Sequence, residues 1–150
     1  MARLGWILFL IMTIITSGLV YKFIIKGEVE VAPDGRTILL LEESEQAFFL
    51  NEMRTFLVAI QQITDGIEKD DMDQVAKAAK SVGSADLVHV PASLMAKLPL
   101  AVKKMGLGTH KAFDQMAMDA EQLGDKDHAL SQLNQILPVC TACHAIYKIR

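Results

Sequence analysis

The residues Cys140-Thr141-Ala142-Cys143-His144, close to the C-terminus, are the stretch from which the rest of this sequence can be interpreted. Cys-x-x-Cys-His is the attachment signature of c-type haem, in which two thiols form thioethers and the adjacent histidine supplies an axial nitrogen to iron. Positions i, i+3 and i+4 of a helix share one face, so Cys140, Cys143 and His144 can address one porphyrin. The motif therefore predicts one covalent haem c whose iron has His144 as its proximal ligand.

Three other interpretations of the motif are weaker. A thioredoxin-like dithiol would begin a helix after a strand in a βαβ unit, whereas this motif ends the last predicted helix. A structural zinc ion needs four ligands, and the remaining histidines, His89, His110 and His128, lack a paired ligand spacing. A disulfide within Cys-x-x-Cys on a helix would be strained, and it would leave His144 without a role.

The N-terminal region carries much of the apolar content of this 150-residue chain, which is 51% hydrophobic. No charged residue occurs from position 4 to position 21, about 18 residues, which is near the lower limit for a membrane-spanning helix. Thr16-Ser17-Gly18 offers small residues for signal-peptide cleavage, but there is no Ala-x-Ala and apolar residues continue to Ile25. We expect residues 1–24 to be an uncleaved single-pass anchor, with a cleaved signal peptide as the alternative.

Composition excludes several classes of function. The formal net charge of −3, without a basic cluster, argues against nucleic-acid binding. Both cysteines lie in the motif, which excludes a disulfide framework. The sequence has no glycine-rich phosphate loop, no nucleophile elbow and no paired carboxylates at a defined spacing, so we do not expect an enzyme.

Residues 25–43 predict a short β-hairpin. Residues 28–31 alternate between polar and apolar, residues 33–36 read Pro-Asp-Gly-Arg, which is a turn signal, and residues 37–41 favour a strand. An irregular spacer is the alternative. Because an isolated two-stranded hairpin is marginal in water, we expect this one to pack on the main domain or on a partner.

Residues 44–150 predict four amphipathic helices. The first runs from about residue 44 to the charged residues 68–71, and the second from about 72 to 82. Residues 84–105 predict a long connection with one helical turn at 92–97, because Pro91 and Pro99 interrupt them. The apolar stripe of the first helix comprises Phe49, Met53, Phe56, Ile60, Ile63 and Ile67.

The third helix is predicted from Gly108 or Thr109 to Leu123, and the fourth follows a cap at Asp125. Pro138 predicts a kink or a break in the fourth helix. Inward positions of the third helix are predicted to be His110, Phe113, Met116, Ala117 and Ala120, and those of the fourth Leu130, Leu133, Ile136 and Leu137, followed by Cys140, His144 and Tyr147.

Four such helices with the motif on the last resemble the cytochrome c-prime and cytochrome c-556 family, the class II c-type cytochromes. The resemblance covers about residues 44–150 and rests on the motif and on Tyr147-Lys148, which match the family's aromatic and then basic residue. Lys148 stands where arginine is commoner. The resemblance implies an all-α, antiparallel four-helix bundle. Here a transmembrane helix and a hairpin or spacer precede that bundle, and Tyr147 and Lys148 are candidate haem contacts.

Chain order suggests the second axial ligand of the iron. In an up-down-up-down bundle the end of the last helix meets the start of the first, so His144 should face Met53. The Met53 thioether is the candidate distal ligand, with core packing as the alternative. His110 is the second candidate, or else it caps its helix or contacts a propionate. Arg54 is a possible propionate contact or a surface residue.

These expectations lead to three hypotheses on function. The first is a monohaem cytochrome, anchored in the inner membrane and facing the periplasm, which exchanges electrons with a redox protein or with a respiratory or photosynthetic membrane complex. The second is a five-coordinate haem that binds nitric oxide or carbon monoxide, as c-prime members of the family do. The third is an accessory haem subunit, for which the anchor and the hairpin serve assembly. A homodimer is compatible with each hypothesis.

Overall fold

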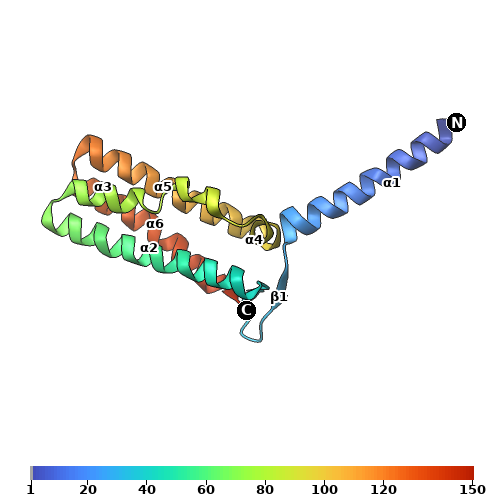
Figure 1. Ribbon diagram of the computed structural model, residues 1–150, viewed down its shortest axis with the longest axis horizontal. Coiled ribbons are helices and arrows are strands. Elements are labelled where there is room, and N and C mark those ends of the chain that lie inside the picture. Colours follow the sequence, from blue (N-terminus) through green and yellow to red (C-terminus); the bar gives the residue numbers. More distant parts are fainter. Residues whose placement is uncertain (1) are drawn as a thin grey trace.

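The computed structural model describes residues 2–150, and most of them are helical (Figure 1). A long helical rod leads into three short strands and a body of packed helices. In chain order the elements are α1 (Ala2–Val20), the π-helix η1 (Tyr21–Lys26), β1 (Val29–Val31), β2 (Thr37–Leu39), α2 (Glu43–Lys69), α3 (Met72–Lys80), the 3₁₀-helix η2 (Ser84–His89), α4 (Ala92–Lys97), α5 (Leu100–Leu123), α6 (Lys126–Ile146) and β3 (Tyr147–Ile149).

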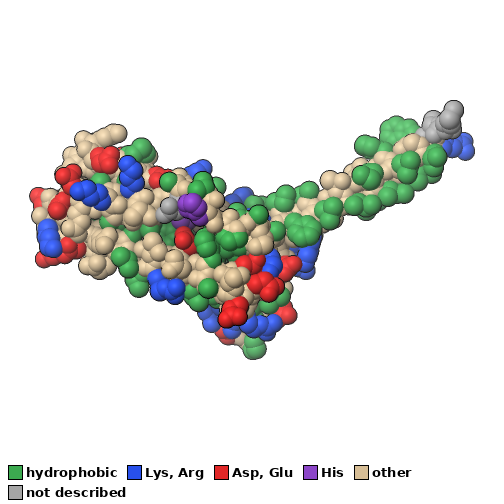
Figure 2. Space-filling view, in the orientation of Figure 1, with side chains coloured by type: hydrophobic (Ala, Val, Ile, Leu, Met, Phe, Trp, Pro, Cys, Tyr) green, Lys and Arg blue, Asp and Glu red, His purple; other side chains and the backbone are tan. Residues whose placement is uncertain are grey.

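The N-terminal rod consists of α1 and η1 and projects away from the folded body (Figure 1). Within the 24 residues from Arg3 to Lys26, an 18-residue window has a mean hydropathy of 2.1, and none of that window is buried. Figure 2 shows the rod as an almost continuous apolar surface. The predicted apolar N-terminal helix is therefore confirmed. By length and composition it can cross a membrane, a property that signal sequences share.

The helical body alternates in direction along the chain (Figure 1). Helix α2 runs away from the rod and α3 returns, η2 and α4 complete the return, α5 runs outward again, and α6 comes back. Helices α2 and α5 each contact both α3 and α6. The main core between these four helices is tightly closed, since Ile63, Val75, Phe113 and Met116 have no measurable exposure. We call the end of the body beside β1, where the rod joins, the rod end.

Helix α5 begins earlier than the sequence pattern predicted. It starts at Leu100, directly after Pro99, and not near Gly108. Proline is well suited to a helix start because its φ angle is already helical and the amide proton it lacks would be unpaired there. Gly106 and Gly108 then lie inside the helix, where nothing would contact an added Cβ atom. The predicted helical turn at 92–97 is confirmed as α4.

Helix α6 follows the predicted cap but is not broken at Pro138. The Asp125 carboxylate accepts hydrogen bonds from the backbone amides of Asp127 and His128, and the helix continues through Pro138 to Ile146. The predicted inward positions of Leu130 and His144 are wrong. Leu130 is 44% exposed while Ala129 is buried, and His144 is exposed as well.

The predicted hairpin is confirmed, and a third strand joins it. Strands β1 and β2 pair antiparallel, with Val29 opposite Leu39. Strand β3, which begins three residues after His144, pairs parallel with β2, so that Thr37 lies opposite Tyr147. The backbone amide of Arg150 donates to the Leu39 carbonyl at 3.1 Å. The hairpin is thus packed on the main domain through the C-terminus.

A second core lies at the rod end and joins this sheet to the helices. Its buried members come from β2 and the residues just after it, from α4 and the residue after it, and from the start of α5, and they exclude water from the junction of these elements. They are Leu39, Leu41, Leu94, Leu98 and Val102, with Phe48, Phe49, Met105 and Tyr147 among the half-buried residues around them.

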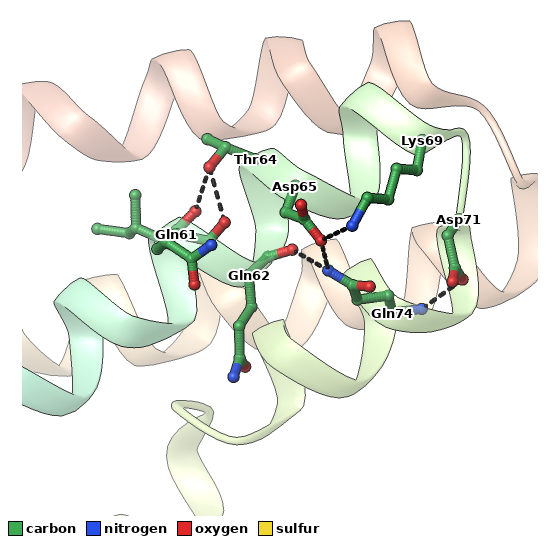
Figure 3. Close-up of polar contacts among 8 residues, drawn as sticks. Gln61, Gln62, Thr64, Asp65, Lys69, Asp71 and Gln74 are labelled. Atoms are coloured by element: carbon green, nitrogen blue, oxygen red, sulfur yellow. Dashed lines mark hydrogen bonds and ion pairs between the residues drawn. The ribbon is translucent and has the colours of Figure 1, made fainter.

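The α2–α3 turn, at the opposite end of the body, is held by polar contacts (Figure 3). The Asp71 carboxylate caps α3 by accepting from the Gln74 backbone amide at 2.9 Å. The Gln74 side-chain amide donates to the Gln62 carbonyl and to Asp65, both at 2.8 Å. Lys69 donates to the same Asp65 carboxylate at 2.8 Å. These contacts fix the antiparallel path of α3 against α2.

A buried carboxylate organises the start of α2. Glu45 accepts from the Glu42 backbone amide at 2.9 Å, which is half of a capping box. It also forms an ion pair with Lys97, at the end of α4, at 2.8 Å. The hydrogen bond from Lys97 lowers the pKa of Glu45 below its usual value of 4.5. Lys97 thereby connects α4 to α2.

We predict that Lys97→Met destabilises the protein most at neutral pH. Because the folded-state pKa of Glu45 is lowered, the pair stabilises the fold above the unfolded-state value and loses this effect as pH falls through the folded-state value. The melting temperature, followed by circular dichroism in detergent, should therefore fall clearly at neutral pH, and the difference from wild type should shrink as the pH is lowered below the ordinary carboxyl pKa of 4.5. Glu42→Gln, which removes a 77% exposed partner of the same lysine, should change little at either pH. If Lys97→Met lowered the melting temperature equally at neutral and at acidic pH, the Glu45–Lys97 ion pair would not be the source of the stabilisation.

Candidate functional site

The three motif side chains lie near the end of α6, close to the rod end. Cys140 and Cys143 are half-buried free thiols, and His144 is exposed. Burial raises the pKa of both thiols above the ordinary value, so they are protonated at neutral pH. Because the three residues occupy positions i, i+3 and i+4 of one helix, they share one face. The arrangement offers two thiols and an imidazole to a single planar group.

A groove between α5 and α6 leads to this face. Its volume is about 550 Å³. The side of the groove formed by α5 carries small side chains, because three of its residues are Gly108, Thr109 and Ala112; we call this side the low wall. Ile136 and Val139 belong to the opposite side, which α6 forms. Cys143 lies one helical turn beyond Val139 and Cys140 one turn beyond Ile136, so the motif continues the α6 side. The other lining residues are Lys104, Met105, Gln115, Gln132 and Gln135.

Met53 lies on the half-buried side of α2, one turn before Phe56. The Phe56 ring stacks on Phe113 with centroids 5.6 Å apart and tilts against the His110 ring at 4.9 Å. Met53 is therefore one turn nearer the rod end than this aromatic group. This is the half of the body in which α6 carries the motif.

His110 is a core residue and not a helix cap. It lies in the middle third of α5 and is 6% exposed. Its Nδ1 atom is 2.9 Å from the Val82 carbonyl. A carbonyl can only accept, so Nδ1 carries the proton and Nε2 is left as the free ring nitrogen. The alternative that His110 caps its helix is wrong, because the helix begins ten residues earlier.

The remaining predicted contacts have other partners or face solvent. Tyr147 is half-buried against the second core. The Lys148 ammonium is 3.2 Å from the Asp34 carboxylate in the hairpin turn. Arg36 and, to a smaller extent, Lys148 lower the pKa of Asp34 to about 2. Arg54 is exposed on α2, so neither basic side chain is buried beside the motif.

Met105 is a candidate ligand that the sequence pattern did not reveal. The sequence pattern places Met105 at the edge of the long connection, whereas the structure has it half-buried in the first turns of α5, where it lines the groove. The available signal was Pro99, which marks a helix start as readily as an interruption. In the described part of the chain, no three His, Cys, Asp or Glu side chains gather as a metal-binding group.

We predict that Gly108→Leu blocks the covalent haem attachment that the motif leads us to expect. The new side chain would project from the low α5 wall into the groove, which is open at this position. Haem per chain, measured from the absorption of the purified protein, should drop to a small fraction of the wild-type value. Gly106→Leu is the matched control, since Gly106 also faces open space but does not line the groove. Full haem content in Gly108→Leu would show that the groove is not used.

The comparisons with known proteins leave the site to be interpreted from its own residues. No match for this chain was found among protein-family models, curated proteins or solved structures. The chemical groups that the site offers are two thiols and an imidazole on one face of α6, beside a groove whose α5 side carries small residues.

Proposed function

We propose that this chain is a membrane-anchored monohaem c-type cytochrome that transfers electrons on the periplasmic side of the inner membrane. One observation carries the proposal: Cys140, Cys143 and His144 share one face of α6, which continues the wall of a groove near the rod end. The sequence spacing matches c-type haem attachment, and the groove gives the attached group a place to lie.

The residues of the site fit a covalently held haem. A groove of about 550 Å³ is within the usual range of cofactor and ligand sites. Small residues on α5 leave room for a flat ring, and Ile136 and Val139 offer it an apolar wall. Cys140 and Cys143 would hold the two vinyl groups as thioethers, and His144 would supply the proximal nitrogen. When bound, the haem supplies an iron that alternates between the ferric and ferrous states.

The proposal includes the architecture of a class II cytochrome. The alternating directions of α2, α3, α5 and α6, and the contacts of α2 and α5 with both α3 and α6, support an antiparallel four-helix bundle. Such bundles hold cofactors between facing helices. The haem domain would then comprise about residues 44–150, and the rod and the hairpin would be additions to it.

Met53 is the proposed second axial ligand. It is half-buried on α2, in the half of the body that carries the motif, and a thioether opposite histidine raises the reduction potential of haem iron. If His144 and Met53 both held the iron, no position on it would be left for a substrate. The protein would therefore turn nothing over, and it would differ from a five-coordinate binder of nitric oxide or carbon monoxide.

The rod is proposed to be a retained anchor. Cleavage near Gly18 would leave Leu19, Tyr21, Phe23 and Ile24 at the new N-terminus, and each of these side chains is about half exposed or more. A run of exposed large apolar side chains is unfavourable in water. Retention keeps these residues in lipid and ties the haem domain to the membrane, where its redox partner would be found.

We predict that Met53→Ala changes the iron from low spin to high spin. Loss of the thioether would open the distal position, so the ferrous form should bind carbon monoxide and the reduction potential should fall. Absorption and paramagnetic resonance spectra of the purified protein, with a redox titration, measure all three effects. Met118→Ala, at an exposed position towards the other end of α5, should leave the spectra unchanged.

Two results would contradict the assignment of Met53. A wild-type spectrum that is already high spin would favour the gas-binding function. A low-spin spectrum that persists in Met53→Ala would transfer the ligand role to Met105, which lines the groove, or to His110. Met105→Ala and His110→Ala, measured in the same way, distinguish these two residues.

A further inference from the structure

Four lysines surround the point at which the rod joins the folded body. Lys22 and Lys26 belong to η1, and Lys103 and Lys104 to the first turns of α5. We call this set the basic collar. Figure 2 shows lysine and arginine side chains where the apolar rod meets the body. The last residue of the apolar rod, Lys26, is itself a member of the collar.

The two segments that carry the collar lysines are in direct contact. The Lys103 ammonium donates to the Phe23 carbonyl at 3.0 Å, and Phe23 lies between Lys22 and Lys26 in the chain. Lys22 and Lys26 are exposed, as is Lys104, the neighbour of Lys103. The collar is therefore one patch built from two segments about 80 residues apart in the sequence.

The junction below the collar is fixed and not a flexible linker. The Glu28 backbone amide donates to the Lys97 carbonyl at 2.7 Å. Gly27 has a positive φ angle of 69°, and a Cβ atom there would overlap the backbone of Lys97 and lie 2.7 Å from the Pro99 nitrogen. The chain thus leaves the rod in close contact with the α4–α5 connection, which keeps the collar in a constant relation to the rod.

The collar differs from the other basic residues of the rod end in its lack of carboxylate partners. Within the residues that the structure describes, none of its four lysines forms an ion pair. Like charges in one patch repel each other unless anions lie nearby. The neighbouring basic residues are neutralised by the fold itself, as the pairs Lys97–Glu45, Lys148–Asp34 and Arg150–Glu30 show.

We propose that the basic collar binds the headgroups of anionic phospholipids. Because the apolar rod ends at Lys26, a rod that spans the bilayer holds the collar at headgroup depth. Basic residues at this depth are attracted to an anionic leaflet. The haem domain would then be held at a fixed orientation, with its rod end against the membrane. This inference rests on the retained anchor of the proposed function, but not on haem.

The test measures which lipids surround the full-length protein. The protein is reconstituted in phosphatidylcholine vesicles that contain spin-labelled phosphatidylglycerol or spin-labelled phosphatidylcholine, and paramagnetic resonance gives the fraction of each label immobilised by the protein. We expect labelled phosphatidylglycerol to be preferred roughly fivefold, the factor for one lysine near an anionic surface. Lys22→Gln/Lys26→Gln, which leaves the groove residues unchanged, should lower this preference clearly, and high salt should bring it to near unity.

The control variant is Lys80→Gln/Lys111→Gln, which removes two charges from exposed positions outside the collar and should keep the preference. Equal immobilisation of the two labelled lipids by the wild type would overturn the proposal. The collar would then be a surface for an acidic protein partner. The proposal would also be overturned if the test and control variants lost the preference for phosphatidylglycerol to the same extent, because the preference would then follow the overall charge and not the collar. If neither label is immobilised, the chain does not enter the bilayer, and the anchor fails as well. The haem spectrum of the same sample reports separately on the haem site.

Discussion

The parallel pairing of β3 with β2 is the constraint on which the arrangement of the rest depends. It joins the residues just after the Cys-x-x-Cys-His motif to the hairpin just after the rod. His144 is three residues before β3, and Lys26 is three residues before β1. The second core then fills the space between this sheet, α4 and the start of α5. The motif is thereby kept near the rod end of the molecule.

This connection bears on how electrons would reach the haem. A domain joined to a membrane helix by a flexible linker can meet soluble partners in many orientations. Here Gly27, the Glu28–Lys97 hydrogen bond and the basic collar hold the domain against the end of the rod. A haem at the rod end would lie close to the membrane surface. The geometry favours a partner that is itself bound to the membrane.

The regular parts of the fold could be predicted because their signals are local. The helical stripes, the Asp125 cap and the hairpin turn each lie within a short stretch of sequence. Strand β3 could not be predicted in this way, because three residues carry no periodicity and their partner is β2, more than 100 residues earlier. The start of α5 was placed too late because Gly106 and Gly108 are weak helix formers, although Pro99 was compatible with a helix start.

The residues of the candidate site also fall into those with a local sequence signal and those without one. Cys140, Cys143 and His144 are defined by their spacing alone, whereas Met53, Met105 and His110 depend on tertiary packing.

The most direct measurement for the central claim is the intact mass of the purified protein after denaturation. The account predicts the polypeptide plus one haem, retained in the denaturant and lost in Cys140→Ala/Cys143→Ala. A wild-type protein from a haem-attaching host that shows only the polypeptide mass would contradict it.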